Sequence, residues 1–182
     1  SEYITDQSEG SFEPYPYGEA ANVSNYSSIT LGDDAFSAAI NIGFSFEFFG
    51  ETFTQFRISS NGFVRLGTAG GSTGVGAQSI PNAADPDNLI AGYWTDLNPA
   101  SGGTIETYRA GTGSNEIRVI NFIDVPHFLN VGANTFQIVL YESSNIIQVY
   151  LDSVTTDGGF ITQGIEDSNG DTALAVTGRN QA

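Results

Sequence analysis

Apolar and polar residues alternate along several short stretches of the chain. Between residues 42 and 48, every even position is apolar and every odd position is small or polar. Apolar residues also recur at every second position from 136 to 140 and from 147 to 151. A period of two places one set of side chains on a buried face of a strand and the other set toward solvent. The pattern therefore predicts half-buried antiparallel strands.

Such stretches follow one another from Tyr26 onward, and no convincing amphipathic helix interrupts them. Turn-forming pairs such as Asn61-Gly62 and Asn169-Gly170 separate them. Strands spaced about 8–12 residues apart are typical of a sandwich or a barrel. We therefore expect an all-β fold, an antiparallel β-sandwich of the jelly-roll or Ig-like Greek-key type. The expected strands are 26–31, 39–49, 52–59, 63–66, 89–94, 104–109, 116–123, 135–142, 146–151, 162–166 and 173–176.

The first 25 residues differ from the rest of the chain, since they contain five carboxylates and no cation. Prolines at alternate positions, Pro14 and Pro16, favour extended backbone. We interpret residues 1–25 as an extended acidic arm and residues 26–182 as a single β-sandwich domain. The arm is either a disordered tail or a segment that docks on a neighbouring molecule. Its candidate anchors are Tyr3, Phe12, Tyr15 and Tyr17.

The charge balance excludes several classes of partner. The 182 residues include 21 acidic and 5 basic side chains, which gives a net charge of −16, and all the basic residues are arginines. Nucleic-acid binding is not expected, because its affinity comes from basic residues that release counterions. No apolar run approaches the ~18 residues of a membrane span, so membrane insertion is not expected either. The absence of lysine and cysteine, with many uncharged polar residues, suggests an extracellular protein.

Five segments, in their order and spacing, carry a resemblance to a known family. They read FSFEFFG at 44–50, ISSNGF at 58–63, LIAGYWTDL at 89–97, FQIVLYE at 136–142 and GIE at 164–166. This pattern resembles nidogen-like extracellular domains and related β-rich modules of bacterial and archaeal secreted surface proteins. The resemblance covers about residues 40–175. It implies an extracellular adhesion or matrix module and supplies no catalytic set.

A binding module is expected to expose aromatic side chains beside its loops. The candidates for such a surface are Tyr93, Trp94 and Tyr108. Trp94 ends a strand of apolar residues, so a position in the core is the alternative to a role in binding a sugar.

Two groups of oxygen-bearing side chains are candidates for Ca²⁺, the one cofactor that the sequence suggests. Asp167, Asn169 and Asp171 have the D-x-N-x-D spacing of the first calcium ligands of an EF-hand loop. The rest of that loop departs from the EF-hand pattern, so a polar hairpin turn is the alternative. The second group consists of three further aspartates: Asp85, Asp87 and Asp96.

No catalytic machinery is expected. The segment GGSTG at 70–74 matches the G-x-S-x-G motif around Ser72, but it lies in a glycine-rich loop rather than between a strand and a helix. His127 is the only histidine available as a base. Asn22 and Asn25 are N-glycosylation acceptors in hosts that glycosylate such sequons.

Two functions of different classes follow. One is a non-enzymatic adhesion or interaction module that binds a protein or a carbohydrate at the cell surface. The alternative is a structural subunit of an extracellular, pilus-like filament that binds copies of itself. In that alternative, the N-terminal arm adds a strand to a neighbouring subunit.

Overall fold

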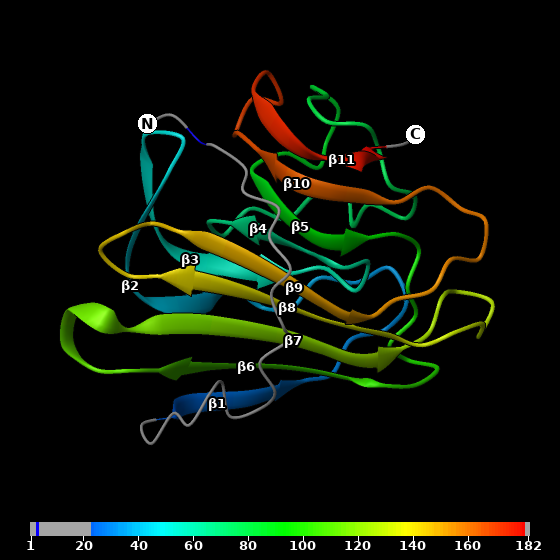
Figure 1. Ribbon diagram of the computed structural model, residues 1–182, viewed down its shortest axis with the longest axis horizontal. Helices are drawn as coiled ribbons and strands as arrows, with labels where there is room; N and C mark the ends of the chain where they lie inside the picture. The colour runs from blue at the N-terminus through cyan, green and yellow to red at the C-terminus, as the bar shows by residue number, and fades with distance from the viewer. Residues whose placement is uncertain (1–2, 4–22, 181–182) are drawn as a thin grey trace.

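The computed structural model describes residue 3 and residues 23–180, which form a β-sandwich (Figure 1). Two antiparallel sheets, one of five strands and one of six, pack face to face. The described residues contain no helix long and apolar enough to cross a membrane. The strands are β1 (Ser24–Ile29), β2 (Ile40–Phe48), β3 (Glu51–Ile58), β4 (Phe63–Leu66), β5 (Leu89–Trp94), β6 (Thr104–Ala110), β7 (Ile117–Val125), β8 (Asn134–Tyr141), β9 (Ile147–Ser153), β10 (Thr162–Glu166) and β11 (Ala173–Asn180).

The strand order confirms the predicted antiparallel sandwich. Strands β2 to β5 form a meander, and β10 and β11 extend it to the six-stranded order β11-β10-β5-β4-β3-β2. Strands β6 to β9 form a second meander with β1 at its edge, in the order β1-β6-β7-β8-β9. Every predicted strand is present. The largest error is at the end of β11, which continues from the predicted residue 176 to Asn180.

The core between the sheets follows from the alternating pattern. In β2 the even positions from Ile42 to Phe48 are buried and the odd positions are exposed. These side chains join a cluster that includes Phe122 and Phe136, whose rings stack with their centroids 4.6 Å apart. Burying each such side chain contributes roughly 1.5–3 kcal/mol. The inter-sheet core therefore fixes the register of β2 on its partner strand.

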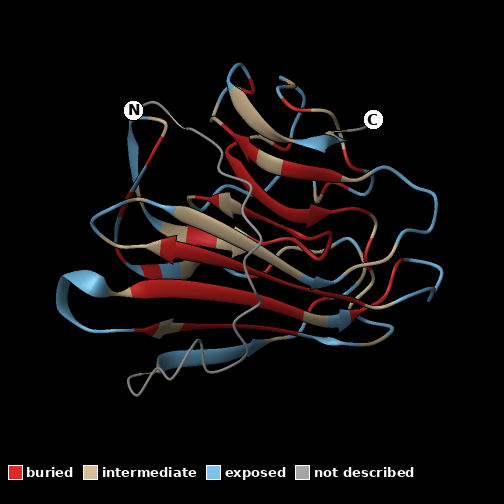
Figure 2. Cartoon of the chain, in the orientation of Figure 1, coloured by how far each residue is buried: buried red, intermediate tan, exposed pale blue. Residues whose placement is uncertain are grey.

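The five-stranded sheet is buried on its outer face as well. Tyr108, Val119 and Val139, all 0% exposed, form a second cluster on the side of this sheet away from the inter-sheet core. Val23, just before β1, packs against the same cluster. Antiparallel sheets commonly leave one face in water, which gives a clean alternation of apolar and polar residues. Here β7 and β8 are buried almost continuously, as Figure 2 shows.

The turn between β3 and β4 is buried, which is unusual for a turn. Ser59, Ser60 and Asn61 are each 0% exposed. Gly62 has a φ of 87°, and its carbonyl oxygen accepts hydrogen bonds from the backbone N–H groups of Gly92 and Tyr93, both at 3.1 Å. The turn thus inserts against the end of β5 instead of projecting into solvent.

Substituting Gly62 with alanine should destabilise the domain by about 3 kcal/mol, from the cost of a positive φ plus a backbone clash. A Cβ atom at this position would lie 2.1 Å from the carbonyl oxygen of Tyr93. Gly50→Ala is the matched control. Gly50 has a φ of 82°, but a Cβ atom added there would meet no other atom within 4 Å. The free energy of unfolding of this variant should therefore fall by only about 1 kcal/mol. Denaturant unfolding of both variants measures the difference; equal losses would contradict the prediction.

Candidate functional site

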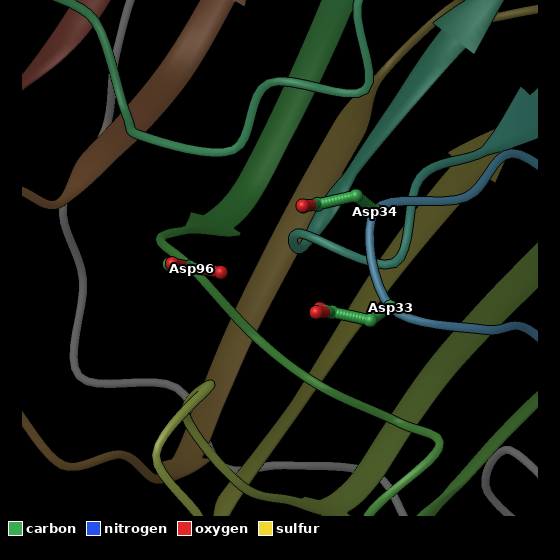
Figure 3. A group of neighbouring side chains, drawn as sticks. All are labelled: Asp33, Asp34 and Asp96. Atoms are coloured by element: carbon green, nitrogen blue, oxygen red, sulfur yellow. The ribbon is translucent and has the colours of Figure 1, made fainter.

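Three aspartates from distant parts of the chain meet at one end of the sandwich. Asp33 and Asp34 lie in the connection between β1 and β2, and Asp96 follows the end of β5. One carboxylate oxygen from each lies within 4.8 Å of the other two, and Figure 3 shows the three carboxylates facing a common space. We call these three residues the acidic cluster.

The buried side chain of Asn61 positions this cluster. Its Nδ2 donates to Oδ1 of Asp34 at 2.9 Å, and its Oδ1 accepts the backbone N–H of Leu97 at 2.9 Å. Asp34 itself has a φ of 49°, a left-handed conformation that aspartate tolerates better than most residues. One buried amide therefore ties the segment that carries Asp34 to the segment that carries Asp96.

Holding these carboxylates together is electrostatically unfavourable. Burial, together with the charges of Asp34, Asp33 and Asp157, raises the pKa of Asp96 from its ordinary 3.8 to about 6, although His127 acts in the opposite direction. Burial and the neighbouring Asp34 also raise the pKa of Asp33. One oxygen of Asp33 and one of Asp96 are buried without a hydrogen-bond partner among the described residues. The cluster is therefore a place where the fold retains unfavourable charge.

Carboxylate oxygens are the ligands of hard cations such as Ca²⁺. The acidic cluster is the one group of metal-ligating side chains that the described part of the chain brings together. It supplies three carboxylates, whereas Ca²⁺ takes six to eight oxygen ligands. A cation bound here would need backbone oxygens or water to complete its shell. Sequence reasoning missed Asp33 and Asp34 as a site, although the pair lies between two predicted strands, 26–31 and 39–49.

The predicted grouping of Asp85, Asp87 and Asp96 is wrong. Asp85 and Asp87 precede β5 and Asp96 follows it, so the length of the strand, roughly 20 Å for six residues, separates them. Asp85 instead binds Arg65, with 2.7 Å between Nη1 and Oδ1. Asp87 interacts electrostatically with Asp85, Arg65 and Asp167. The acidic residues therefore divide between the two ends of the sandwich.

The predicted Ca²⁺ loop at Asp167, Asn169 and Asp171 has the contacts of a polar turn. Oδ1 of Asp167 accepts the backbone N–H groups of Asp171 and Thr172, at 2.9 and 3.2 Å. This arrangement joins β10 to β11 and matches the hairpin alternative that the sequence left open. Calcium binding at this loop stays a prediction.

Next to this turn, Glu166 is a buried acid. Its side chain is 1% exposed; Oε1 accepts the backbone N–H of Asn82 at 2.6 Å, and Oε2 has no partner among the described residues. Burial raises the pKa of Glu166 from 4.5 to about 7; the hydrogen bond from Asn82 opposes this shift, and the charges of Asp87 and Asp167 add to it. The fold thus favours the protonated form of Glu166.

The expectation that Tyr93, Trp94 and Tyr108 form an exposed aromatic surface is wrong. They are 4%, 1% and 0% exposed. Nε1 of Trp94 donates to the carbonyl oxygen of Gly74 at 2.8 Å, because the glycine-rich loop folds over the indole ring. The hydroxyl of Tyr93 donates to the carbonyl oxygen of Thr155 at 2.7 Å. The core alternative for Trp94 is therefore the correct one.

At the end of the sandwich that carries the acidic cluster, the exposed apolar side chains come instead from the loop between β7 and β8. This loop spans residues 126–133, and we call it the apolar loop. Phe128, Leu129 and Val131 are 47%, 73% and 49% exposed. The backbone N–H of Phe128 donates to the carbonyl oxygen of Asp96 at 3.0 Å, so the apolar loop lies directly beside the acidic cluster. Phe160, 55% exposed, lies on the β9–β10 loop at the same end (Figure 1).

Two buried polar side chains anchor the apolar loop. His127 is 0% exposed, and its Nε2 lies 3.0 Å from the carbonyl oxygen of Thr155, to which it donates. Asn134, also 0% exposed, donates to the carbonyl oxygen of Val125 at 3.0 Å and accepts the backbone N–H of Thr155 at 2.8 Å. The apolar side chains are therefore presented by a loop whose two ends are fixed.

Few of the predicted arm residues fall within the described part of the chain. Tyr3 packs against its own domain, with its ring centroid 4.8 Å from that of Phe49. Asn25 lies exposed on β1, which begins two residues before the predicted domain boundary. The remaining predicted anchors and the other sequon lie outside the described residues: Phe12, Tyr15, Tyr17 and Asn22.

Replacing Asp96 with asparagine should stabilise the folded protein at pH 7.5. A pKa of about 6 in the folded state, against 3.8, means that deprotonation costs stability as the pH rises from about 4 to about 6. The full shift corresponds to about 3 kcal/mol, and partial exposure reduces it to about 1 kcal/mol. Thermal unfolding in metal-free buffer measures this. The gain should vanish near pH 4, and Asp152→Asn, at an exposed position of β9, should show none.

Glu166→Gln should stabilise the protein by about 2 kcal/mol at pH 8 and by little at pH 5. The reason is that the folded-state pKa of about 7 lies above the unfolded value, so wild-type stability falls as the pH rises between these limits. Denaturant unfolding at both pH values tests this, and an equal difference at pH 5 and pH 8 would contradict it.

The comparisons with known proteins agree with the resemblance found in the sequence. A family model described as NIDO related matches residues 2–182. No curated protein and no solved structure matches the chain significantly. Proteins of the nidogen-related family are typically extracellular. Because the match spans nearly all of the sequence, this chain belongs to the NIDO-related family.

Proposed function

We propose that this protein is a non-enzymatic extracellular interaction module that binds a protein partner through its apolar loop. The observation that carries the proposal is the exposure of Phe128, Leu129 and Val131 on a loop anchored by buried hydrogen bonds. Single exposed apolar residues are common, but a contiguous group at one place is typical of an interaction site. Membership of the NIDO-related family supports the more general part of this proposal, that the chain is a β-rich module of an extracellular type.

A protein partner fits this surface better than a carbohydrate does. Leu129 and Val131 are aliphatic and offer no group that could hydrogen-bond to a sugar hydroxyl. Buried apolar anchors surrounded by a polar rim are the usual arrangement in protein interfaces. A carbohydrate would find more polar contacts in the open pocket of about 490 Å³ that Tyr93, Thr156 and Arg179 help to line. Nucleic acid is not proposed, because the net charge is −16.

The absence of catalysis is part of the proposal. Ser72 lies in the loop between β4 and β5, where its Oγ accepts the backbone N–H of Gly74 at 3.2 Å. His127 lies beyond the end of β7 and is bound to Thr155. Nucleophilic catalysis requires a base within hydrogen-bonding reach of the nucleophile. The contacts of these two residues support a structural role for each.

Binding to the surface of the producing cells tests this function. Leu129→Ser/Val131→Ser should weaken the binding of a fluorescently tagged protein by at least about tenfold, as expected for the centre of an interface. Ile146→Ser is the matched control, because Ile146 is 51% exposed on the β8–β9 hairpin at the opposite end of the sandwich.

Treatment of the cells identifies the class of partner. Protease should abolish wild-type binding and periodate should not, since periodate oxidises sugars. Loss of binding after periodate alone would replace the protein partner with a carbohydrate. Equal binding by wild type and the double variant would overturn the role of the apolar loop.

A further inference from the structure

A pocket lies between the β9–β10 loop and the end of β11, at the same end of the sandwich as the apolar loop (Figure 1). Its volume of about 490 Å³ falls within the range of roughly 300–1,000 Å³ that is typical of small-molecule sites. Tyr93 of β5 lines it together with these two segments, and none of its lining residues belongs to the apolar loop. The interaction proposed for the apolar loop therefore leaves this pocket unused.

The wall that β11 contributes is a bulge in the edge strand of the six-stranded sheet. Between two regularly paired positions, residues 176–179 of β11 lie opposite the single Gln163 of β10. Asn180, just after the bulge, holds its end in place. Its Oδ1 accepts the backbone N–H of Ile80 and its Nδ2 donates to the carbonyl oxygen of Ile80, both at 2.8 Å. Bulges commonly redirect side chains beside functional sites.

This bulge places Arg179 in the wall of the pocket. The structure describes all five arginines of the chain, and Arg179 is the only exposed one. Its Nη1 donates to Oε1 of Gln163 at 2.6 Å, and no carboxylate of the described residues lies within 4.0 Å of its guanidinium nitrogens. A guanidinium has five N–H donors. The contacts of Arg179 with described residues therefore leave most of its donors available to an anionic ligand.

The wall that the β9–β10 loop contributes combines polar backbone with aliphatic surface. Gly158 lines the pocket, and a Cβ atom added there, or at Gly178 in the opposite wall, would meet no other atom within 4 Å. Oγ1 of Thr156 accepts the backbone N–H of Gly158 at 3.0 Å, which leaves its O–H able to donate. Ile161 supplies aliphatic surface. A sugar matches this combination, because its ring carries closely spaced hydroxyl groups and apolar C–H faces.

Tyr93 holds this loop wall in place and reports the charges around the pocket. It is 4% exposed, and its hydroxyl donates to the carbonyl oxygen of Thr155 at 2.7 Å. Burial raises the pKa of Tyr93; the charge of Arg179 opposes this shift, and the charge of Asp157 adds to it. One cation and one anion therefore flank the pocket. Because Asp157 repels negative charge, a ligand with a single carboxylate fits better than a doubly charged phosphate monoester.

We propose that this pocket binds a single uronic acid residue of a glycan, with the sugar carboxylate on the guanidinium of Arg179 and the ring hydroxyls on Thr156 and the glycine backbone. Arginine pairs with a carboxylate through two parallel hydrogen bonds. A polyuronate is disfavoured, because the net charge of −16 repels a polyanion. That repulsion is screened beyond roughly 8 Å at physiological ionic strength, whereas Arg179 contacts its ligand directly.

Two sugars that differ only in the carboxylate test this site. Methyl β-D-glucuronide carries a carboxylate where methyl β-D-glucoside carries a hydroxymethyl group. Each is titrated into isotope-labelled protein, and NMR follows the amide signals of Gly158, Gly159 and Gly178, which all line the pocket. The glucuronide should bind with a Kd in the millimolar range, about tenfold more tightly than the glucoside, because the carboxylate adds charge-assisted hydrogen bonds.

Arg179→Gln should weaken glucuronide binding about tenfold and leave glucoside binding unchanged, which shows that the pocket is intact. Arg57→Gln is the matched control and should bind both sugars as the wild type does. It removes the same charge from β3, four places from β11 in the sheet order and thus roughly 19 Å away. Arg179→Lys, which keeps the charge but not the planar fork, should fall between the wild type and Arg179→Gln.

Equal binding of the two sugars, no binding of either, or wild-type affinity of Arg179→Gln for the glucuronide would overturn the proposal. N-acetylglycine, which carries a carboxylate on a peptide group, is the third ligand. If it binds as tightly as the glucuronide, the pocket accepts a peptide C-terminus and the assignment to a sugar is wrong. Leu129→Ser/Val131→Ser should bind the glucuronide as the wild type does, so a failure here leaves the function of the apolar loop untouched.

Discussion

At the end of the sandwich that carries the acidic cluster, the arrangement of the loops depends on the burial of a single turn, Ser59–Gly62. Its Asn61 side chain binds the segment of Asp34, and through Nδ2 it also reaches the carbonyl oxygen of Thr73 at 3.3 Å. Its Oδ1 binds Leu97. A buried amide of this kind must satisfy all of its groups, so the three loops that supply its partners cannot shift independently. The side-chain network of one residue thus determines where the functional loops lie.

The geometry of this turn has an electrostatic consequence at the surface. Because Asn61 fixes the segments on both sides, Asp33, Asp34 and Asp96 cannot move apart to relieve their repulsion. Burial is the largest cause of the raised pKa of Asp96, and the charges of Asp34 and Asp33 add to it. The extensive apolar cores of the domain offset the stability that is lost by holding these carboxylates together. Natural proteins commonly retain such unfavourable groups at functional sites. The neighbouring apolar loop concentrates a second unfavourable feature, exposed Leu129, at the same end.

The strands could be predicted from the sequence, but the site could not. Alternation in β2 and turn pairs such as Asn61-Gly62 are local signals, and they indicated the sandwich and nearly all strand limits. The grouping of carboxylates depends on which strand ends meet, and Asp96 and Asp85 lie at opposite ends of β5. The error on Trp94 has the same origin, since only the folded chain brings Gly74 over its indole ring. Both are properties of long-range contact.

The use of the arginines limits what the surface can bind. Arg118, 2% exposed, donates to the backbone carbonyl oxygens of Ile42 and Asn41, and although burial lowers its pKa to about 10 it remains charged at neutral pH. Arg65 is paired with Asp85, and Arg109 with Glu116. Most of the scarce positive charge is thus committed to contacts within the fold, whereas eight of the 16 carboxylates in the described part of the chain are exposed. The net charge of −16 disfavours an acidic partner at this surface, and salt weakens such repulsion.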